Sequence, residues 1–218
     1  MSIRILSVGV PDKYLTHLDK KRITVIRDPK HVGDGVDAMI YWFADRQYGH
    51  ELIDPMGEQL RWVHVPWVGV EQLISERVRA GEVVLTNSRG ATGVSVAEYV
   101  TGCVLSHAKS LPSHFTNQAA RSLTFAPTKE VRGQTALILG LGDIGKHVAR
   151  NLRHLGMRVR AVTRTASPHW ACEEVLSIGH LAIELHSADY VVLCAPSTES
   201  TRHLINDATL SHFKAGHV

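Results

Sequence analysis

The stretch TALILGLGDIG, residues 135–145, decides how this chain folds. Residues 136–139 form an apolar run, and glycines at 140, 142 and 145 follow with the spacing G-x-G-x-x-G. Beyond them, Val148, Leu152 and Leu155 recur at the three- to four-residue spacing of one helix face. An apolar strand that leads through such glycines into an amphipathic helix is typical of a dinucleotide-binding βαβ unit.

Each position of this motif has a physical task. Gly140 permits a tight turn, Gly142 lets the main chain approach a pyrophosphate, and Gly145 lets the helix pack closely on the strand. The free N–H groups at the helix start, which include those of Asp143 and Ile144, carry positive partial charge. The sequence therefore predicts a phosphate-binding loop made of these five residues, with a purely structural glycine turn as the alternative.

The residues after the second strand indicate which nicotinamide cofactor the loop binds. An acidic residue about 20 positions after the motif would bond the ribose 2′-hydroxyl of NAD and repel a 2′-phosphate. This chain instead has Thr163, Arg164 and Thr165, two hydroxyls and a guanidinium that suit a phosphate. We expect NADP, with NAD possible; the alternative is that Arg164 is an ordinary solvated loop arginine.

Alternating β-branched runs and helical stretches predict an α/β fold with two doubly wound parallel-sheet domains. We expect a flavodoxin-like domain over residues 1–100 and an incomplete Rossmann dinucleotide-binding domain over residues 101–218. The first has predicted strands at Ile3–Val8, Ile23–Arg27, Ala38–Phe43, Arg61–Val65 and Val83–Thr86, and helices at Asp12–Lys20 and Val70–Ala80, the latter ended by Gly81. The second has predicted strands at Thr135–Leu139, Arg158–Thr163, Val175–Ile178 and Tyr190–Ala195, and helices at Gly142–Leu155, His180–Ser187 and Asn206–Phe213.

A long helix is predicted where the two domains meet. Ser95-Val96-Ala97-Glu98 has the S-x-x-E pattern of a capping box, so the helix is expected to begin near Val96. Pro112 is expected to end it, and Ser113–Glu130 is expected to be a polar connection.

Composition excludes several classes of function. Of the 218 residues, 44% are hydrophobic and 21% charged, the net charge is +3, and the basic residues are scattered, so we expect neither nucleic acid nor membrane as a partner. The three cysteines are far apart, which predicts reduced thiols and no metal site. Without a run of 18 apolar residues or a signal peptide, the protein is expected to be soluble and cytoplasmic.

Taken together, the motifs resemble the D-isomer-specific 2-hydroxyacid dehydrogenase family, especially its NADPH-dependent glyoxylate/hydroxypyruvate reductase branch. The resemblance spans nearly the whole chain. It rests on four ordered segments: residues 61–71 (RWVHVPWVGVE), 85–90 (LTNSRG) leading into 96–98 (VAE), the glycine motif, and 194–196 (CAP) with Thr201 and 204–206 (LIN).

The resemblance implies the roles of further residues. Val68 and Gly69 would present main-chain N–H groups to the carboxylate of a small 2-oxo or 2-hydroxy acid substrate, which makes residues 1–100 the substrate domain. Ala195 and Pro196 would line the nicotinamide pocket, and Thr201 of the same motif is counted with the cofactor-binding residues. Trp42 is more consistent with a core aromatic than with a substrate shield.

In the family, the catalytic histidine, its carboxylate partner and the arginine all follow the segment that here is Phe213–Val218. We therefore assign no catalytic residue and expect a chain truncated at its C-terminus. The leading hypothesis is an NADPH-preferring 2-oxo acid reductase, and the alternative is a non-catalytic NAD(P)-binding module, comparable to corepressor relatives. The apolar Val96–Leu111 helix matches the family's dimerisation region, so a homodimer is expected, although the same residues could pack within one subunit.

Overall fold

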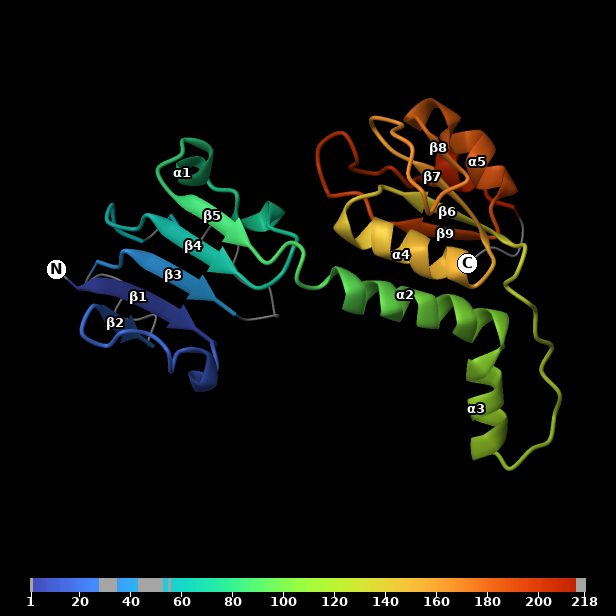
Figure 1. The fold of residues 1–218 in the computed structure, drawn as a ribbon, viewed down its shortest axis with the longest axis horizontal. Coiled ribbons are helices and arrows are strands. Elements are labelled where there is room, and N and C mark those ends of the chain that lie inside the picture. The colour runs from blue at the N-terminus through green and yellow to red at the C-terminus, as the bar shows by residue number, and fades with distance from the viewer. Residues whose placement is uncertain (1, 28–34, 43–52, 55, 215–218) are drawn as a thin grey trace. The chain divides into compact units, whose positions relative to one another are not determined.

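The computed structural model describes residues 2–27, 35–42, 53–54 and 56–214, which form two compact units (Figure 1). The first unit is Met1–Arg89 and the second is Gly90–Val218. The division lies eleven residues before the boundary expected from the sequence, because the whole of the long helix that follows Arg89 packs within the second unit.

The first unit is built on a parallel sheet of five strands in the order β2-β1-β3-β4-β5. This is the flavodoxin-like order, as the sequence predicted. The strands are β1 (Ile3–Val8), β2 (Ile23–Ile26), β3 (Ala38–Tyr41), β4 (Trp62–Val65) and β5 (Val84–Asn87). Phe43, the expected end of β3, lies outside the described residues.

Helices of the first unit are shorter than predicted. Only a 3₁₀ turn, η1 (Asp12–Tyr14), forms where a helix to Lys20 was expected. The hydroxyl of Thr16 and the carboxylate of Asp19 bond nearby main-chain groups, which favours turns over a continuing helix. The predicted helix Val70–Ala80 is divided into η4 (Glu71–Leu73) and α1 (Glu76–Arg79), while Gly81 ends it in the left-handed conformation as expected.

One face of this sheet carries the hydrophobic core of the unit. Leu6, Met39, Tyr41 and Val63 are fully buried there. Trp42 is not part of that core, contrary to expectation, because it is 37% exposed and stacks on Tyr14 at a ring separation of 5.2 Å.

The second unit contains a parallel sheet in the order β8-β7-β6-β9, which matches the first four strands, 3-2-1-4, of the Rossmann order. One face is covered by α2 and α4 and the other by α5 (Figure 1). The strands are β6 (Thr135–Leu139), β7 (Arg158–Val162), β8 (Glu174–Leu176) and β9 (Tyr190–Leu193). The helices are α2 (Gly93–Ala108), α3 (Leu111–Ala119), α4 (Asp143–His154), η5 (Ile178–His180), α5 (Leu181–Ser187) and α6 (Asp207–Leu210).

Two predictions about the long helix were wrong. The helix α2 begins at Gly93, so Ser95 lies inside its first turn and forms no capping box. Pro112 does not end α2; the chain breaks at Ser110, which has a positive φ of 50°, and Pro112 lies in the first turn of α3. A proline fits there because the first N–H groups of a helix have no partner within it. Part of the expected polar connection is therefore helical.

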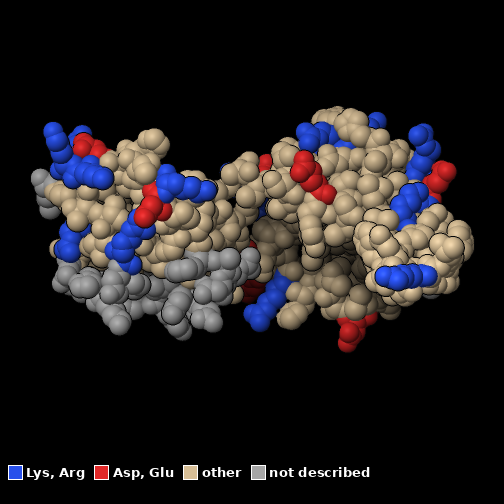
Figure 2. All heavy atoms as spheres, turned by 90° about the horizontal axis from the view of Figure 1, so that it is seen from below, with Lys and Arg blue, Asp and Glu red and all other residues tan. Residues whose placement is uncertain are grey.

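The helix predicted at Asn206–Phe213 is reduced to α6, a single turn. Asn206 precedes it and forms a genuine capping box with Thr209. No helix within the described ranges is long and apolar enough to cross a membrane. On the described part of the face in Figure 2, Lys and Arg side chains are dispersed among acidic ones.

Candidate dinucleotide-binding site

The glycine loop lies at the carboxyl edge of the second sheet, where three strands end together. The N–H of Gly140 donates to Val162 O of β7 at 2.9 Å, and the N–H of Cys194 donates to Leu139 O at 2.9 Å. β6 is thus flanked by β7 on one side and β9 on the other. Parallel sheets bind ligands at this type of position, where the strand order reverses direction.

Two of the three glycines are required by close main-chain contacts. Gly140 has a φ of +100°, and a Cβ there would lie 2.8 Å from the nitrogen of Ala195. A Cβ on Gly145 would lie 2.1 Å from the carbonyl oxygen of Gly140. These glycines therefore close the loop against its neighbours, as the motif predicted for the turn and for the helix packing.

Gly142 differs from the other two because it faces open space. A Cβ built on it would meet nothing within 4 Å, and the residue is exposed. It precedes α4 without a side chain that could cap the helix. Asp143 and Ile144 form the first turn, so their N–H groups lie at the positive end of the helix. This open helix start fits a pyrophosphate.

Asp143 contributes its main chain rather than its carboxylate to this surface. Its carboxylate lies against the start of α2, since a Cβ on Gly93 would be 2.2 Å from Asp143 Oδ2. The other oxygen lies 3.8 Å from Nε2 of His147. The role of Gly93 was not predicted from the sequence, because Gly93 lies 50 residues before Asp143, the residue that it contacts.

The loop after β7 holds the predicted determinants of cofactor choice. Thr163 and Thr165 bond locally: Thr163 Oγ1 accepts from the N–H of Ala166 at 3.0 Å, and Thr165 Oγ1 accepts from Ser167 at 3.3 Å. Arg164 is exposed two residues beyond Val162, the strand end that bonds to Gly140. Its guanidinium is therefore exposed beside the end of β7.

The loop after β9 borders the glycine loop on the other side. Ala195 is the residue against which Gly140 packs, and Pro196 is exposed. Thr201 bonds within its own loop, because its hydroxyl donates to Pro196 O and accepts from the N–H of Thr198 at 2.8 Å. Thr201 therefore fixes the shape of this loop. Cys194, which sequence analysis used only as part of the motif, packs near Gly145, and burial raises the pKa of its thiol.

Val68 and Gly69 lie in the first unit, in the bend that follows β4. Asn87 at the end of β5 donates from Nδ2 to Val68 O at 2.7 Å and so fixes this bend. Gly69 is exposed, and Glu71 Oε2 would lie 3.1 Å from a Cβ built on Gly69. Asn87 was missed as a supporting residue, although it belongs to the segment 85–90 on which the resemblance rests.

His64 is bonded within the first unit. Its Nδ1 lies 3.0 Å from Oγ1 of Thr86, which also accepts from Nε1 of Trp62 at 2.8 Å. Its Nε2 lies 3.4 Å from Oγ of Ser88. These bonds tie β4 to β5, so His64 has a structural role. The described residues hold no group of three or more His, Cys, Asp or Glu that could bind a metal.

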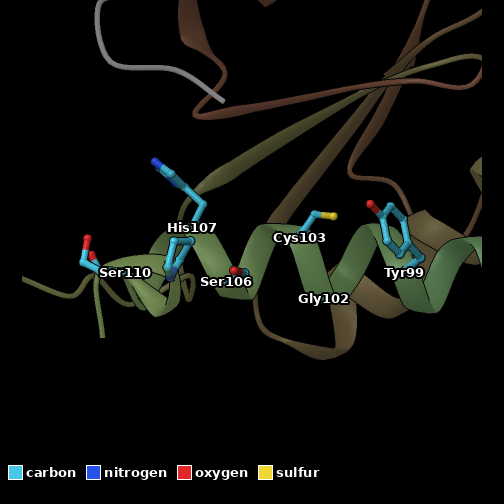
Figure 3. Close-up of a pocket in the computed structure, with 8 residues that line it drawn as sticks. Tyr99, Gly102, Cys103, Ser106, His107 and Ser110 are labelled. Atoms are coloured by element: carbon cyan, nitrogen blue, oxygen red, sulfur yellow. The ribbon is translucent and has the colours of Figure 1, made fainter. Parts of the chain in front are cut away.

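A pocket elsewhere in the second unit is lined by α2, α3 and the residues between them (Figure 3). Tyr99, Gly102, Cys103 and Ser106 contribute one helix face to it. None of its lining residues belongs to the glycine loop, so it is a separate feature of the surface.

Comparison with known proteins identifies the family. The sequence model of "D-isomer specific 2-hydroxyacid dehydrogenase, NAD binding domain" matches residues 101–218. The chain belongs to the D-isomer-specific 2-hydroxyacid dehydrogenase family.

Three relatives illustrate the likeness. A Streptomyces coelicolor protein described as "Uncharacterized protein in mprR 3'region" is 34% identical over 70% of this chain and 55% of its own length. The glyoxylate reductase of Thermococcus kodakarensis is 29% identical over 82% of this chain and 56% of its own. The crystal structure of a family member from Aeromonas salmonicida has a TM-score of 0.82 and 27% identity, and covers 99% of this chain and 71% of that chain. The chain thus spans little more than half the length of these two curated relatives.

Proposed function

We propose that this chain binds NADP in preference to NAD, and that it provides the cofactor site and part of the substrate site of a reductase for small 2-oxo acids. The observation that carries the proposal is the glycine loop. Gly140 and Gly145 are closed off by main-chain contacts, whereas Gly142 between them is open at the start of α4. That combination leaves the main chain at Gly142 open to a pyrophosphate.

The residues around the loop take distinct parts in the proposed complex. The N–H groups of Asp143 and Ile144 bond the pyrophosphate, and Arg164 pairs with the 2′-phosphate. Ala195 and Pro196 border the nicotinamide at the end of β9. Bound NADPH supplies the hydride that reduces the substrate carbonyl.

For the substrate, we propose a 2-oxo acid of the glyoxylate or hydroxypyruvate type. The main-chain N–H groups of Val68 and Gly69 bind its carboxylate, in a bend that Asn87 fixes. The likeness to the glyoxylate reductase of Thermococcus kodakarensis supports this substrate class. We assign the proton transfer to no described residue.

The test is to follow NADPH and NADH oxidation at about 340 nm, the absorbance band of the reduced nicotinamide, with glyoxylate or hydroxypyruvate as substrate. We expect the rate with NADPH to exceed that with NADH. Acetate, which has the carboxylate but no reducible 2-oxo group, is the matched control and should give no oxidation. Cofactor binding without oxidation would favour the alternative, a non-catalytic NAD(P)-binding module.

We further propose that a second copy of the chain covers the outer face of α2 and α3, which would make the protein a homodimer. Val96, Tyr99 and Cys103 form an exposed stripe on α2, and Phe115 of α3 is 63% exposed. An exposed apolar face of this kind is typical of a protein interface. The free thiols of the three cysteines are consistent with the cytoplasm, where we place the protein.

A further inference from the structure

The side chain of His64 bridges the two residues that flank Asn87. Nδ1 of its ring lies 3.0 Å from Oγ1 of Thr86, and Nε2 lies 3.4 Å from Oγ of Ser88. His64 of β4 is also the strand partner of Thr86 in β5. One half-buried ring therefore holds the main chain immediately before and immediately after Asn87.

The hydroxyl of Thr86 fixes the directions of these hydrogen bonds. It donates its hydrogen to Val63 O at 3.3 Å, so Oγ1 is an acceptor toward its other partners. One of them is the N–H of Trp62 Nε1 at 2.8 Å, and the other is the N–H of His64 Nδ1. Nε2 of the neutral ring then accepts from the hydroxyl of Ser88. Both nitrogens of the imidazole are thus in use.

Asn87 lies on the other face of the sheet from this bridge. Successive side chains of a strand alternate between the two faces, and Thr86 and Ser88 share the face of His64. Asn87 pairs across the strands with Val65, whose side chain is fully buried. The bridge on one face therefore sets the position of the asparagine on the other.

The amide of Asn87 orients one main-chain donor of the bend after β4. Nδ2 donates to Val68 O at 2.7 Å, and Oδ1 accepts from the N–H of Arg89 at 3.3 Å. In a trans peptide, the carbonyl oxygen of one residue and the N–H of the next point in opposite directions. The bond to Val68 O therefore directs the N–H of Gly69 away from Asn87. It also polarises the same peptide, which makes that N–H a stronger donor.

We propose that His64 is a positioning residue for the carboxylate-binding bend and acts on it through Asn87. His64 has this role only if the N–H groups of Val68 and Gly69 bind a substrate carboxylate, as proposed above. The imidazole fixes the main chain on both sides of Asn87, and Asn87 fixes the peptide between Val68 and Gly69. The substrate then meets a donor that is already oriented, so less conformational freedom is lost on binding.

The test uses oxamate, a stable amide analogue of a small 2-oxo acid, as the probe. Its binding to the full chain is followed through the NMR shifts of the Val68 and Gly69 amides. His64→Leu removes both bonds of the bridge, and Asn87→Ala removes the bond to the bend. Trp62→Phe is the matched control, because it removes a different hydrogen bond to the same Thr86 hydroxyl.

We expect His64→Leu and Asn87→Ala each to raise the dissociation constant of oxamate by about tenfold. The double variant should bind no more weakly than Asn87→Ala alone, because two residues that act through one contact give non-additive effects. Trp62→Phe should stay within about 1.5-fold of the wild type, since the bridge is intact in it.

Two conservative variants keep the test decisive if His64→Leu does not fold. His64→Asn keeps an N–H near the position of Nδ1 and loses the acceptor for Ser88. His64→Gln keeps an acceptor near the position of Nε2 and loses the donor to Thr86. Each should weaken oxamate by about threefold, because one of the two bonds remains.

The outcomes separate the role of His64 from the proposed substrate site. Unchanged oxamate affinity in the His64 variants, or losses in the double variant that multiply, would overturn the positioning role alone. A loss in Trp62→Phe as large as that in His64→Leu would do the same. If oxamate shifts neither the Val68 nor the Gly69 amide of the wild-type chain, the proposed carboxylate site is overturned as well.

Discussion

At the scale of single residues, the three glycines of the motif have separate requirements. Gly140 needs both its positive φ and the space beside Ala195, and Gly145 needs the space beside the Gly140 carbonyl. Gly142 has an ordinary φ of −72° and open space around it. The structure of the free protein therefore requires two of these glycines, and only the bound ligand requires the third.

This difference predicts opposite effects of two alanine substitutions. Gly145→Ala should lower the free energy of unfolding by about 1–3 kcal/mol, because its Cβ overlaps a main-chain oxygen. Gly142→Ala should cost less than about 1 kcal/mol, while weakening NADH and NADPH alike at the place where the pyrophosphate approaches. Urea unfolding and fluorescence titration of both variants measure the two effects. Unchanged cofactor affinity in Gly142→Ala would contradict the assigned loop.

Cys172 gives a prediction about pH. Burial raises the pKa of its thiol to about 11, and the charge of Arg153 opposes this only in part. Burial makes the folded state favour the neutral thiol of Cys172 over the thiolate. This contribution to the free energy of unfolding is therefore present below about pH 9 and is lost as the pH rises toward 11.

Between pH 8 and pH 11, ionisation of Cys172 should therefore remove up to about 2–3 kcal/mol from the free energy of unfolding. Cys172→Ala has no thiol to titrate and should lose less stability over the same range. Urea unfolding at several pH values measures the difference between the two proteins. Parallel stability curves would argue against a buried neutral thiol.

The sequence predicted which residues form the glycine loop, because their spacing and the flanking apolar strand carry that information locally. It did not predict the orientation of Asp143, which depends on Gly93 fifty positions earlier. The local bonds of Thr201 were also missed, because the resemblance placed Thr201 with the cofactor-binding residues but gave no indication of the loop geometry around it.

At the scale of elements, strands were predicted better than helices. Strands such as β6 are buried along their whole length, so an apolar run identifies them directly. Helix boundaries depend on side chain-to-main chain bonds that a pattern indicates less clearly. Ser75 caps α1 by accepting from the N–H of Val78 at 3.3 Å, whereas Ser95, in the pattern of a capping box, forms no such cap.

These two serines make a matched pair for measurement. Ser75→Ala should lower the free energy of unfolding by about 1 kcal/mol, since a buried cap is lost. Ser95→Ala should change it by less than about 0.5 kcal/mol, because the exposed position within α2 favours alanine. Thermal or urea unfolding distinguishes them. A larger loss of stability in Ser95→Ala than in Ser75→Ala would indicate that Ser95 caps α2, contrary to the structure.

At the scale of the whole molecule, the apolar stripe of α2 and α3 bears on assembly. If a second copy covers it, the protein should sediment with twice the chain mass of 24.0 kDa. Tyr99→Asp places a charge in the middle of the stripe and should shift the protein toward the monomer. Ile183→Asp is the control, because Ile183 is similarly exposed, at 69%, but lies on α5. A Tyr99→Asp protein that still sediments as a dimer would place the interface elsewhere.

The fold class of both units followed from the sequence, since alternating strands and helices are typical of parallel sheets covered on both faces. The family was also recognisable from four short motifs. Substrate choice was not, because the bend at Val68 and Gly69 contributes main-chain groups whose selectivity depends on whatever surrounds them.

The most direct test of the account is a calorimetric titration of the full chain with NADPH and with NADH, repeated on Arg164→Ala. We predict one site per chain, with NADPH bound about tenfold more tightly than NADH. In Arg164→Ala that advantage should shrink while NADH affinity is kept. Equal affinities for the two cofactors in the wild-type chain, or equal losses of both in the variant, would contradict the claim that this loop recognises the 2′-phosphate of NADP.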